Sequence, residues 1–276
     1  MNAQTTRRGF LGGVAALAAG AGSPAVAAPA DRLKLGVATY SLRKLSRSQA
    51  IAAIRELRTS YVSIKEFHLP YKSTPEELAK GRREFEEAGL TILSGGNNSI
   101  QKDTDEDVRF FFEYAKACGM PMLVIAPTAQ TLPRIERFVK QYDIKVAVHN
   151  HGREDKHFPT PQSVLKAVKN MDPRVGLCLD VGHTARTGVD VVESIREAGS
   201  RLLDTHIKDL RAPLEKGSQC AVGAGSLPIV RIFQTLVKMD YQGGVMLEYE
   251  IHPDNPLPGM LESFGYMRGV LAGLSA

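Results

Sequence analysis

The feature that most constrains this chain is a repeated alternation of short apolar, β-branched runs with longer segments of helical period, from residue 33 onward. Such repeats are typical of strand–helix units that build a parallel sheet. The runs predicted as strands are residues 33–38, 61–65, 90–94, 122–126, 144–148, 175–179, 202–207 and 244–247. The segments predicted as amphipathic helices include residues 48–59, 75–88, 103–118 and 227–239.

Local signals between the strands support these units. The sequence TPEE at 74–77 supplies an N-cap, a proline at the first helical position and acids in the first turn, and Gly89 follows as a stop. Eight units over residues 28–276, about 249 residues, suit a single-domain (β/α)8 TIM barrel of the α/β class. A doubly wound sheet would need a glycine-rich loop after the first strand, but the sequence there is ATYSLRK.

The amino terminus predicts export. TTRRGFLGG contains Arg7 and Arg8, an uncharged run follows at 14–21, and Ala25-Val26-Ala27 has the pattern of a cleavage site. We therefore predict a twin-arginine signal over residues 1–27 and a periplasmic mature protein that begins near Ala28. The segment is short and rich in Ala and Gly, so we expect no stable membrane anchor after cleavage.

Composition excludes several classes. The formal net charge is +5, and +3 without the two signal arginines, which is too small for a nucleic-acid surface. The three cysteines have no CxxC spacing, so they indicate neither a disulfide framework nor a thiolate metal site. Cys178 lies within an apolar run, and we expect it to pack as a small hydrophobic residue.

Four segments, VHNHG, LDVGH, THIKD and MLEYE, each place a metal-type donor where an apolar run ends. A parallel barrel brings the carboxyl ends of its strands to one rim, so distant donors can converge on a single ion. Two imidazoles and two carboxylates suit Mn²⁺, Fe²⁺, Co²⁺, Ni²⁺ or Zn²⁺ better than Ca²⁺. The competing interpretation is four unrelated strand ends that cap helices. The predicted metal ligands are His149, Asp180, His206 and Glu248.

Residues two apart on a strand share a face, so His151, Lys208 and Glu250 should reach the same rim. Lys208 could stabilise an enolate or protonate a departing oxygen, or it could form an ion pair with Asp209 or Glu250. His151 could act as a general base, or it could cap a helix. We predict His151, Lys208 and Glu248 as the catalytic residues.

Further residues lie near the predicted rim. Lys65 ends the second strand and His68 follows in its loop, and both could contact a substrate; a salt bridge is the alternative for Lys65. The backbone N–H groups of VGAGSLPI (222–229) could bind a phosphate or a hydroxyl, although glycines before a helix often serve turn geometry. A periplasmic location argues against a phosphorylated substrate.

The motifs LDVGH, THIKD, VGAGSLPI and LEYE resemble those of the xylose isomerase-like TIM barrel superfamily, in its sugar phosphate isomerase/epimerase-like branch. That branch includes inosose dehydratases, ketose 3-epimerases and hydroxypyruvate isomerases. The resemblance implies one divalent ion, most often Mn²⁺, with Zn²⁺, Co²⁺, Fe²⁺, Ni²⁺ or Mg²⁺ as alternatives. It implies Asp180, His206 and Glu248 as ligands and His183 as a substrate contact. Where the family commonly has a first glutamate, this chain has His149.

That difference bears on the reaction. Epimerases of the family use two metal-bound glutamates as opposed acid–base groups, and a metal-bound neutral imidazole is a poor second base. We therefore expect a metal-dependent lyase or hydratase that catalyses β-elimination from an unphosphorylated keto sugar or 3-keto-glycoside through an enediolate. An isomerase or epimerase of the same sugars is the alternative, and a non-catalytic sugar-binding barrel is a third. An abasic-site endonuclease is disfavoured, because the extra His and Glu ligands and a basic groove are missing. We expect a small-molecule carbohydrate and no nucleic acid as partners, and a homo-oligomer stays open.

Overall fold

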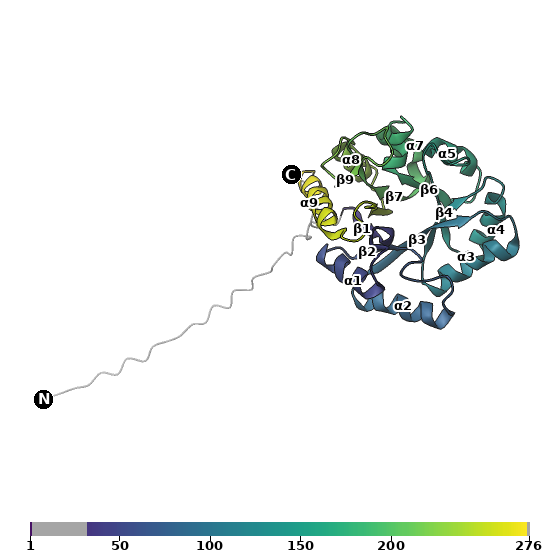
Figure 1. Cartoon of the computed structure of the whole chain (residues 1–276), viewed down its shortest axis with the longest axis horizontal. Coiled ribbons are helices and arrows are strands. Elements are labelled where there is room, and N and C mark those ends of the chain that lie inside the picture. Colours follow the sequence, from purple (N-terminus) through teal and green to yellow (C-terminus); the bar gives the residue numbers. More distant parts are fainter. Residues whose placement is uncertain (2–31, 275–276) are drawn as a thin grey trace.

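Eight parallel strands close into a barrel in the order β1-β10-β7-β6-β5-β4-β3-β2 (Figure 1). The structure is a computed structural model that describes Met1 and residues 32–274. The predicted export signal therefore lies outside the described residues, apart from Met1. The strands are β1 (Lys34–Ala38), β2 (Tyr61–Ile64), β3 (Thr91–Ile100), β4 (Met122–Pro127), β5 (Lys145–His149), β6 (Val175–Asp180), β7 (Leu202–Ile207) and β10 (Gly244–Leu247).

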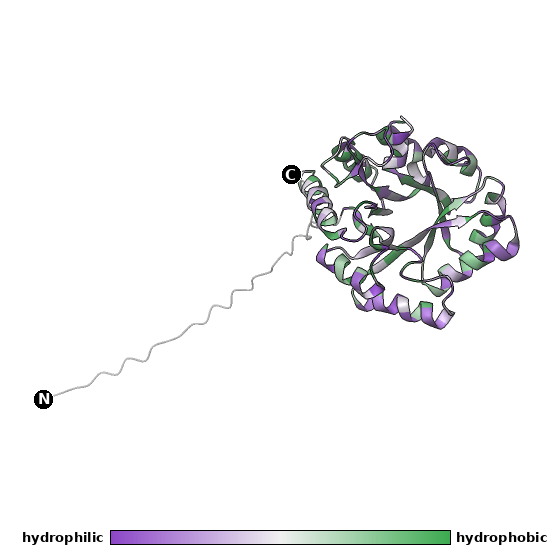
Figure 2. Cartoon of the chain, in the orientation of Figure 1, coloured by the Kyte–Doolittle hydropathy of each residue, from purple (hydrophilic) through white to green (hydrophobic). Residues whose placement is uncertain are grey.

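Helices surround the barrel (Figure 1). Figure 2 shows hydrophobic residues along the strands and hydrophilic residues on the outer sides of the helices, as expected for elements that bury one face. The helices are α1 (Arg47–Glu56), α2 (Pro75–Glu87), α3 (Asp105–Ala117), α4 (Leu132–Tyr142), α5 (Pro161–Val168), α6 (Val181–Arg186), α7 (Val191–Ala198), α8 (Ile229–Lys238) and α9 (Leu257–Gly273), with 3-10 turns η2 (Thr39–Leu42) and η3 (Gly199–Arg201).

The predicted (β/α)8 barrel is confirmed, and every predicted strand overlaps an observed one. The largest difference is in β3, which was expected to end at residue 94 and continues to Ile100. A register irregularity between Gly95 and Asn98 lets the strand bend and go on pairing with β4. This extension brings Asn97 to the carboxyl rim of the barrel.

Two elements add to the rim. A small antiparallel sheet, β8 (Asp209–Leu210) with β9 (Gln219–Cys220), follows β7 directly. The short helix α6 begins at once after β6, with Asp180 as its N-cap. In the part of the chain that the structure describes, no helix is long and apolar enough to cross a membrane.

The barrel interior is closed below the rim. Met122, Val124, Ala147 and Cys178 form a small apolar cluster inside it. Beside them, the Ser94 hydroxyl donates a hydrogen bond to Asp204 Oδ2 at 2.8 Å. Burial raises the pKa of Asp204 to about 6. The interior therefore supports the rim from below and is not a channel.

Candidate metal centre

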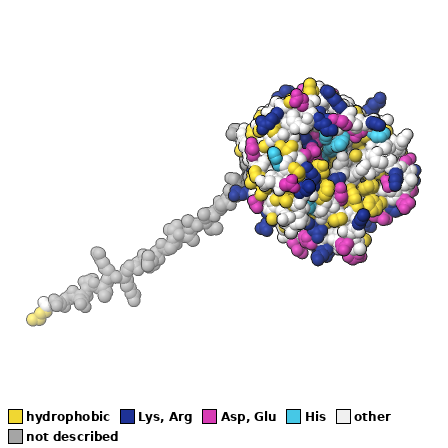
Figure 3. Space-filling view, in the orientation of Figure 1, with side chains coloured by type: hydrophobic (Ala, Val, Ile, Leu, Met, Phe, Trp, Pro, Cys, Tyr) yellow, Lys and Arg dark blue, Asp and Glu magenta, His cyan; other side chains and the backbone are white. Residues whose placement is uncertain are grey.

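The four predicted metal ligands converge at the carboxyl rim. His149 ends β5, Asp180 ends β6, His206 lies on β7, and Glu248 directly follows β10. Parallel pairing sets Asp180 beside His206 and His206 beside Met246, two residues before Glu248. One donor atom from each of the four side chains lies within 4.8 Å of the others, and all four residues are buried. Figure 3 shows histidines beside acidic and basic side chains near the centre of this face.

The donor set fits a divalent cation. His149 Nε2 lies 3.5 Å from Asp180 Oδ2, and His206 Nδ1 lies 3.3 Å from Glu248 Oε2. Among the described residues, Asp180 Oδ2, His149 Nδ1 and both ring nitrogens of His206 are buried without a hydrogen-bond partner. Buried polar atoms normally find partners, and this cluster of unpartnered ring nitrogens and a carboxylate oxygen fits a bound cation. Burial lowers the pKa of His149 to about 4, which keeps its imidazole neutral. Burial alone would also lower the pKa of His206, but its neighbours Cys178 and Glu248 hold it well above its usual value, so binding a cation at His206 would release a proton.

Lys208 is buried among three carboxylates. Its Nζ lies 3.0 Å from Asp180 Oδ2 and 2.9 Å from Glu248 Oε2, and it also contacts Glu250. Burial alone would lower the pKa of Lys208, but the carboxylates hold it well above its usual value. Burial alone would raise the pKa of Asp180 and Glu248, and the Lys208 ammonium holds both well below their usual values. Three carboxylates against one ammonium leave an excess of negative charge, which a divalent cation would offset.

A glycine makes room for this lysine. A Cβ at Gly182 would lie 2.6 Å from Lys208 Cδ and 2.7 Å from its Cγ. The aliphatic stem of Lys208 therefore packs directly against the backbone of Gly182 in the first turn of α6. A residue with a Cβ at position 182 would not permit this close approach. Gly182 of LDVGH thus helps to position the ammonium of Lys208 in THIKD.

Neighbouring side chains orient Asp180. Asn150 Oδ1 accepts the Asp180 N–H at 3.0 Å, and Asn150 Nδ2 donates to Thr184 at 3.1 Å. Asp180 Oδ1 accepts the His183 N–H at 2.7 Å and so caps α6. Because Oδ1 is engaged in the cap, Oδ2 is the oxygen turned to Lys208 and the histidines. The capping role and the ligand role are therefore both filled by one carboxylate.

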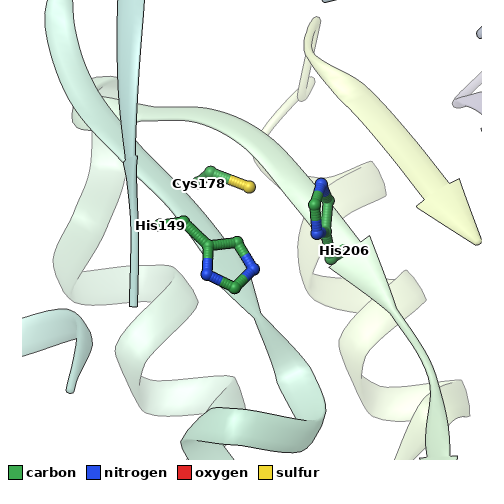
Figure 4. A group of neighbouring side chains, drawn as sticks. All are labelled: His149, Cys178 and His206. Carbon is green, nitrogen blue, oxygen red and sulfur yellow. The ribbon is translucent and has the colours of Figure 1, made fainter. Parts of the chain in front are cut away.

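Cys178 lies directly beneath two of the ligands. Figure 4 shows its sulfur pointing toward the ring of His206 with the ring of His149 close by, and one donor atom from each of the three residues lies within 4.8 Å of the others. Burial raises the pKa of the Cys178 thiol to about 12, so the group is a neutral thiol. It belongs to the apolar cluster inside the barrel, in agreement with its expected packing as a small hydrophobic residue.

Two connected cavities open above these residues. The smaller, about 200 Å³, lies over the ligands, and the larger, about 420 Å³, lies between α6, the β8–β9 sheet and the segment after β10. The smaller cavity is lined by Tyr40, Lys65, Asn97, His149, His151, His183, Glu248 and Glu250. The larger shares Tyr40, His151, His183 and Glu250 with it and is completed by Glu154, Gly182, Arg186, Lys208, Leu210, Lys216, Gly217, Gln219 and Ile251.

The predicted histidines His151 and His183 line both cavities, with ring centroids 4.5 Å apart. Burial lowers the pKa of His183 to about 3, so its imidazole is neutral. Lys65 lines the smaller cavity and also forms an ion pair with Glu66 at 3.0 Å. Both interpretations of Lys65 are therefore compatible with its position.

His68 lies elsewhere. It is 1% exposed, burial lowers the pKa of its ring, and it is not among the residues that line either cavity. Its backbone carbonyl accepts a hydrogen bond from Arg47. The geometry gives no support to the expected substrate contact, because the loop after β2 turns this ring into the protein.

The glycine loop 222–229 also serves the fold. The N–H groups of Gly223 and Gly225 donate to Asp209 Oδ2 at 3.0 and 3.2 Å, and the Leu227 N–H donates to Oδ1 at 3.0 Å. A Cβ at Gly225 would lie 2.2 Å from Asp209 Oδ1. The loop is thus held by the aspartate of THIKD, and these N–H groups are not free for a phosphate. Of the two alternative ion pairs considered for Lys208, the structure shows the one with Glu250.

Several cavity residues were not identified as site residues from the sequence. Tyr40 follows β1, and Asn97 lies on the extended part of β3. Gln219 bridges two elements, since its Nε2 donates to the Glu248 carbonyl at 2.7 Å and its Oε1 accepts the Glu250 N–H at 2.9 Å. The position after β1 is a strand-end signal of the kind that identified the metal ligands, so Tyr40 could have been found in the same way.

Comparison with known proteins identifies the family. The family model described as "Xylose isomerase-like TIM barrel" matches residues 51–270. The chain belongs to the xylose isomerase-like TIM barrel family.

Two inosose dehydratases are among its relatives. The Mesomycoplasma hyopneumoniae (strain 7448) protein is 27% identical over 164 residues, 52% of this chain and 54% of that protein, so this chain spans about half the length of that relative. The Clostridium beijerinckii protein is 24% identical over 219 residues, 72% of this chain and 71% of that protein. A solved structure, the IOLI protein with a bound zinc atom, shares the fold with a TM-score of 0.73 at 16% identity, covering 87% of this chain and 99% of that one.

Proposed function

We propose that this protein is a divalent-metal-dependent carbohydrate lyase that catalyses β-elimination from a keto sugar or a 3-keto-glycoside through an enediolate. The observation that carries the proposal is the cluster of His149, Asp180, His206 and Glu248 with Lys208 against its carboxylates. Two further facts support it: relatives named inosose dehydratase, and a zinc atom in a protein of the same fold.

The four clustered side chains would hold the ion, and their mixture of imidazoles and carboxylates suits Mn²⁺, our first choice, as well as Zn²⁺, Fe²⁺, Co²⁺ or Ni²⁺. When bound, such an ion acts as a Lewis acid toward a ketone and so acidifies the neighbouring C–H bond. His151 is placed to accept that proton, since it lines both cavities and is exposed. Lys208 would donate a hydrogen bond to a developing or departing oxygen once a bound cation takes up the Asp180 and Glu248 oxygens that its ammonium otherwise contacts.

The choice of lyase over epimerase rests on His149. An epimerase with two opposed bases needs a second carboxylate across from Glu248. The residue at the position that could supply it is His149, a buried imidazole beside Asp180. Elimination needs one base and one group to assist the leaving oxygen, which His151 and Lys208 supply. An isomerase or epimerase of the same sugars is the second candidate, favoured by the carboxylate of Glu250 at the cavity wall. A non-catalytic sugar-binding barrel is the third.

We also propose that the mature chain acts in the periplasm after export through the twin-arginine route. The support is the RR pair, the uncharged run and the A-x-A pattern in residues 5–27. A carbohydrate that reaches this site would then be unphosphorylated.

The test of the reaction is product analysis by NMR in D₂O with Mn²⁺ and keto sugars, wild type beside His149→Glu. A lyase yields an unsaturated product or a released aglycone, whereas an epimerase yields a deuterated stereoisomer. We expect the first from wild type and an increased share of epimer from His149→Glu, because the new carboxylate restores a second acid–base group. Clean epimer from the wild type would refute the lyase, and substrate bound without any exchange would favour the sugar-binding barrel.

A further inference from the structure

The cavity over the metal ligands continues into a second, larger one, and the two share four lining residues, Tyr40, His151, His183 and Glu250. The smaller has a volume of about 200 Å³, which is below the ~300–1,000 Å³ typical of complete ligand pockets. The larger has about 420 Å³. A single sugar ring seated at the ligands would leave the larger cavity unused.

The junction of the two cavities carries the group suited to bond cleavage. Lys208 lines the larger cavity, while its Nζ lies 2.9 Å from Glu248 Oε2, which belongs to the smaller one. Glu250 lines both and contacts the same ammonium. A substrate that spans the two cavities would therefore place the bond between its two units next to Lys208.

The wall of the larger cavity favours a neutral unit with one apolar face. Leu210 and Ile251 supply apolar surface, and the Arg186–Glu154 ion pair supplies polar surface. Two of the three cations of this wall are paired, Arg186 with Glu154 and Lys208 with Glu250 as well as with the buried carboxylates, and the third, Lys216, lies on an exposed loop. A phosphate or a carboxylate would find no concentrated positive charge there.

We propose that the larger cavity is a leaving-group subsite, so that the substrate is a keto-glycoside whose keto ring lies at the metal ligands and whose neutral aglycone lies between α6, the β8–β9 sheet and Ile251. This inference rests on the proposed lyase function. For a 3-keto-glycoside, the C2–H bond breaks, a C1=C2 double bond forms, and the C1–O bond breaks. The aglycone oxygen leaves with the electron pair and takes up one proton, so no further reactant is needed.

The test fills the larger cavity and leaves the smaller one open. Ile251→Trp places an indole in the wall, and Lys216→Trp, on an exposed loop residue of the same wall, provides a second variant should the first fail to fold. Val230→Trp, at a 42% exposed position of α8 that lines neither cavity, is the matched control. With Mn²⁺, two rates are measured: p-nitrophenol release from p-nitrophenyl 3-keto-glucoside, and C2–H exchange of 3-keto-glucose in D₂O.

We expect a filled cavity to lower kcat/KM for the glycoside by about tenfold or more while exchange of the free keto sugar stays within about twofold of wild type. The Val230→Trp control should change neither rate. The subsite would be overturned if both cavity variants lowered the rates of exchange and release equally, or changed neither rate. The proposed lyase function would still stand in that case. No exchange and no release from the wild type would refute the proposed function itself, and the subsite with it.

Discussion

Replacing Lys208 by methionine is the sharpest perturbation of this site. Methionine retains an unbranched stem against Gly182 but removes the ammonium from Asp180, Glu248 and Glu250. Lys208 is 4% exposed and Asp180 is 0% exposed, so the lost contacts are between buried charges. Without metal, the variant therefore holds buried carboxylates with no cation beside them.

The expected magnitudes follow from that burial. Removing one partner of a buried ion pair costs about 3–5 kcal/mol, so the metal-free variant should lose about that much free energy of unfolding at pH 7. The ammonium contacts Asp180 Oδ2 and Glu248 Oε2, the two oxygens also closest to the histidine ligands. Lysine and metal thus compete for the same oxygens, and the variant should bind Mn²⁺ about tenfold more tightly or better, which corresponds to about 1.4 kcal/mol or more.

Urea unfolding measures the stability, once in EDTA and once with saturating Mn²⁺, and titration calorimetry measures the metal affinity. Lys65→Met is the matched control, because Lys65 lines the same cavity but pairs with Glu66, away from the ligands. We expect that control to change stability by less than about 1 kcal/mol and to leave Mn²⁺ affinity unchanged. If Lys208→Met bound Mn²⁺ more weakly than or as tightly as the wild type, the idea that lysine and metal compete for the same oxygens would be refuted. If the metal-free variant were as stable as the wild type, the buried ion pairs would not be stabilising contacts.

Three further predictions concern the ligands, the interior and the signal. Asp180→Ala should abolish stoichiometric Mn²⁺ while circular dichroism stays native, whereas Cys178→Ala should retain one ion, and metal loss in the cysteine variant would make the thiol a ligand. Asp204 has a raised pKa of about 6 in the folded protein, so its contribution to stability is fully present below the unfolded pKa near 4 and is lost as pH rises through 6. Asp204→Asn should therefore remove a fall of up to about 3 kcal/mol between pH 4 and 7 in urea unfolding, and an unaltered pH profile would contradict the raised pKa. Changing Arg7 and Arg8 to lysine should retain the precursor in the cytoplasm on fractionation, because twin-arginine recognition depends on the guanidinium pair, and normal export would show that the signal was misread.

Local patterns were sufficient to predict the barrel and the four side chains that cluster at its rim. The strands are buried on both faces and therefore read as continuous apolar runs, which are visible in a short window of sequence. Each ligand follows or ends such a run, and the rule that parallel strands end at one rim brings His149, Asp180, His206 and Glu248 together. The motifs LDVGH and THIKD predicted the family, and the family match confirmed that prediction.

Weak local signals hid other elements. Helix α9 was not predicted, because Gly259, Gly265 and Gly269 lower helix propensity along it. It forms because Met260, Phe264 and Met267 are buried against the rest of the core. Packing across the fold supplies the free energy that the segment lacks on its own.

The sequence by itself thus determined which strand carries each donor residue and which kind of ion those donors suit. Both follow from the residue types and from the spacing of the apolar runs. Only the tertiary structure decided what each side chain contacts. His68 and Lys65 lie in the same short motif and were given the same role from the sequence. In the structure the His68 ring is buried, whereas Lys65 lines the cavity. Lys208 meets its three carboxylates, two of them from beyond β10, and the larger cavity is enclosed by α6, the β8–β9 sheet and Ile251. The contacts of Lys208 join residues up to 42 positions apart. No local sequence pattern predicts them, because burial and charge balance are properties of the closed barrel.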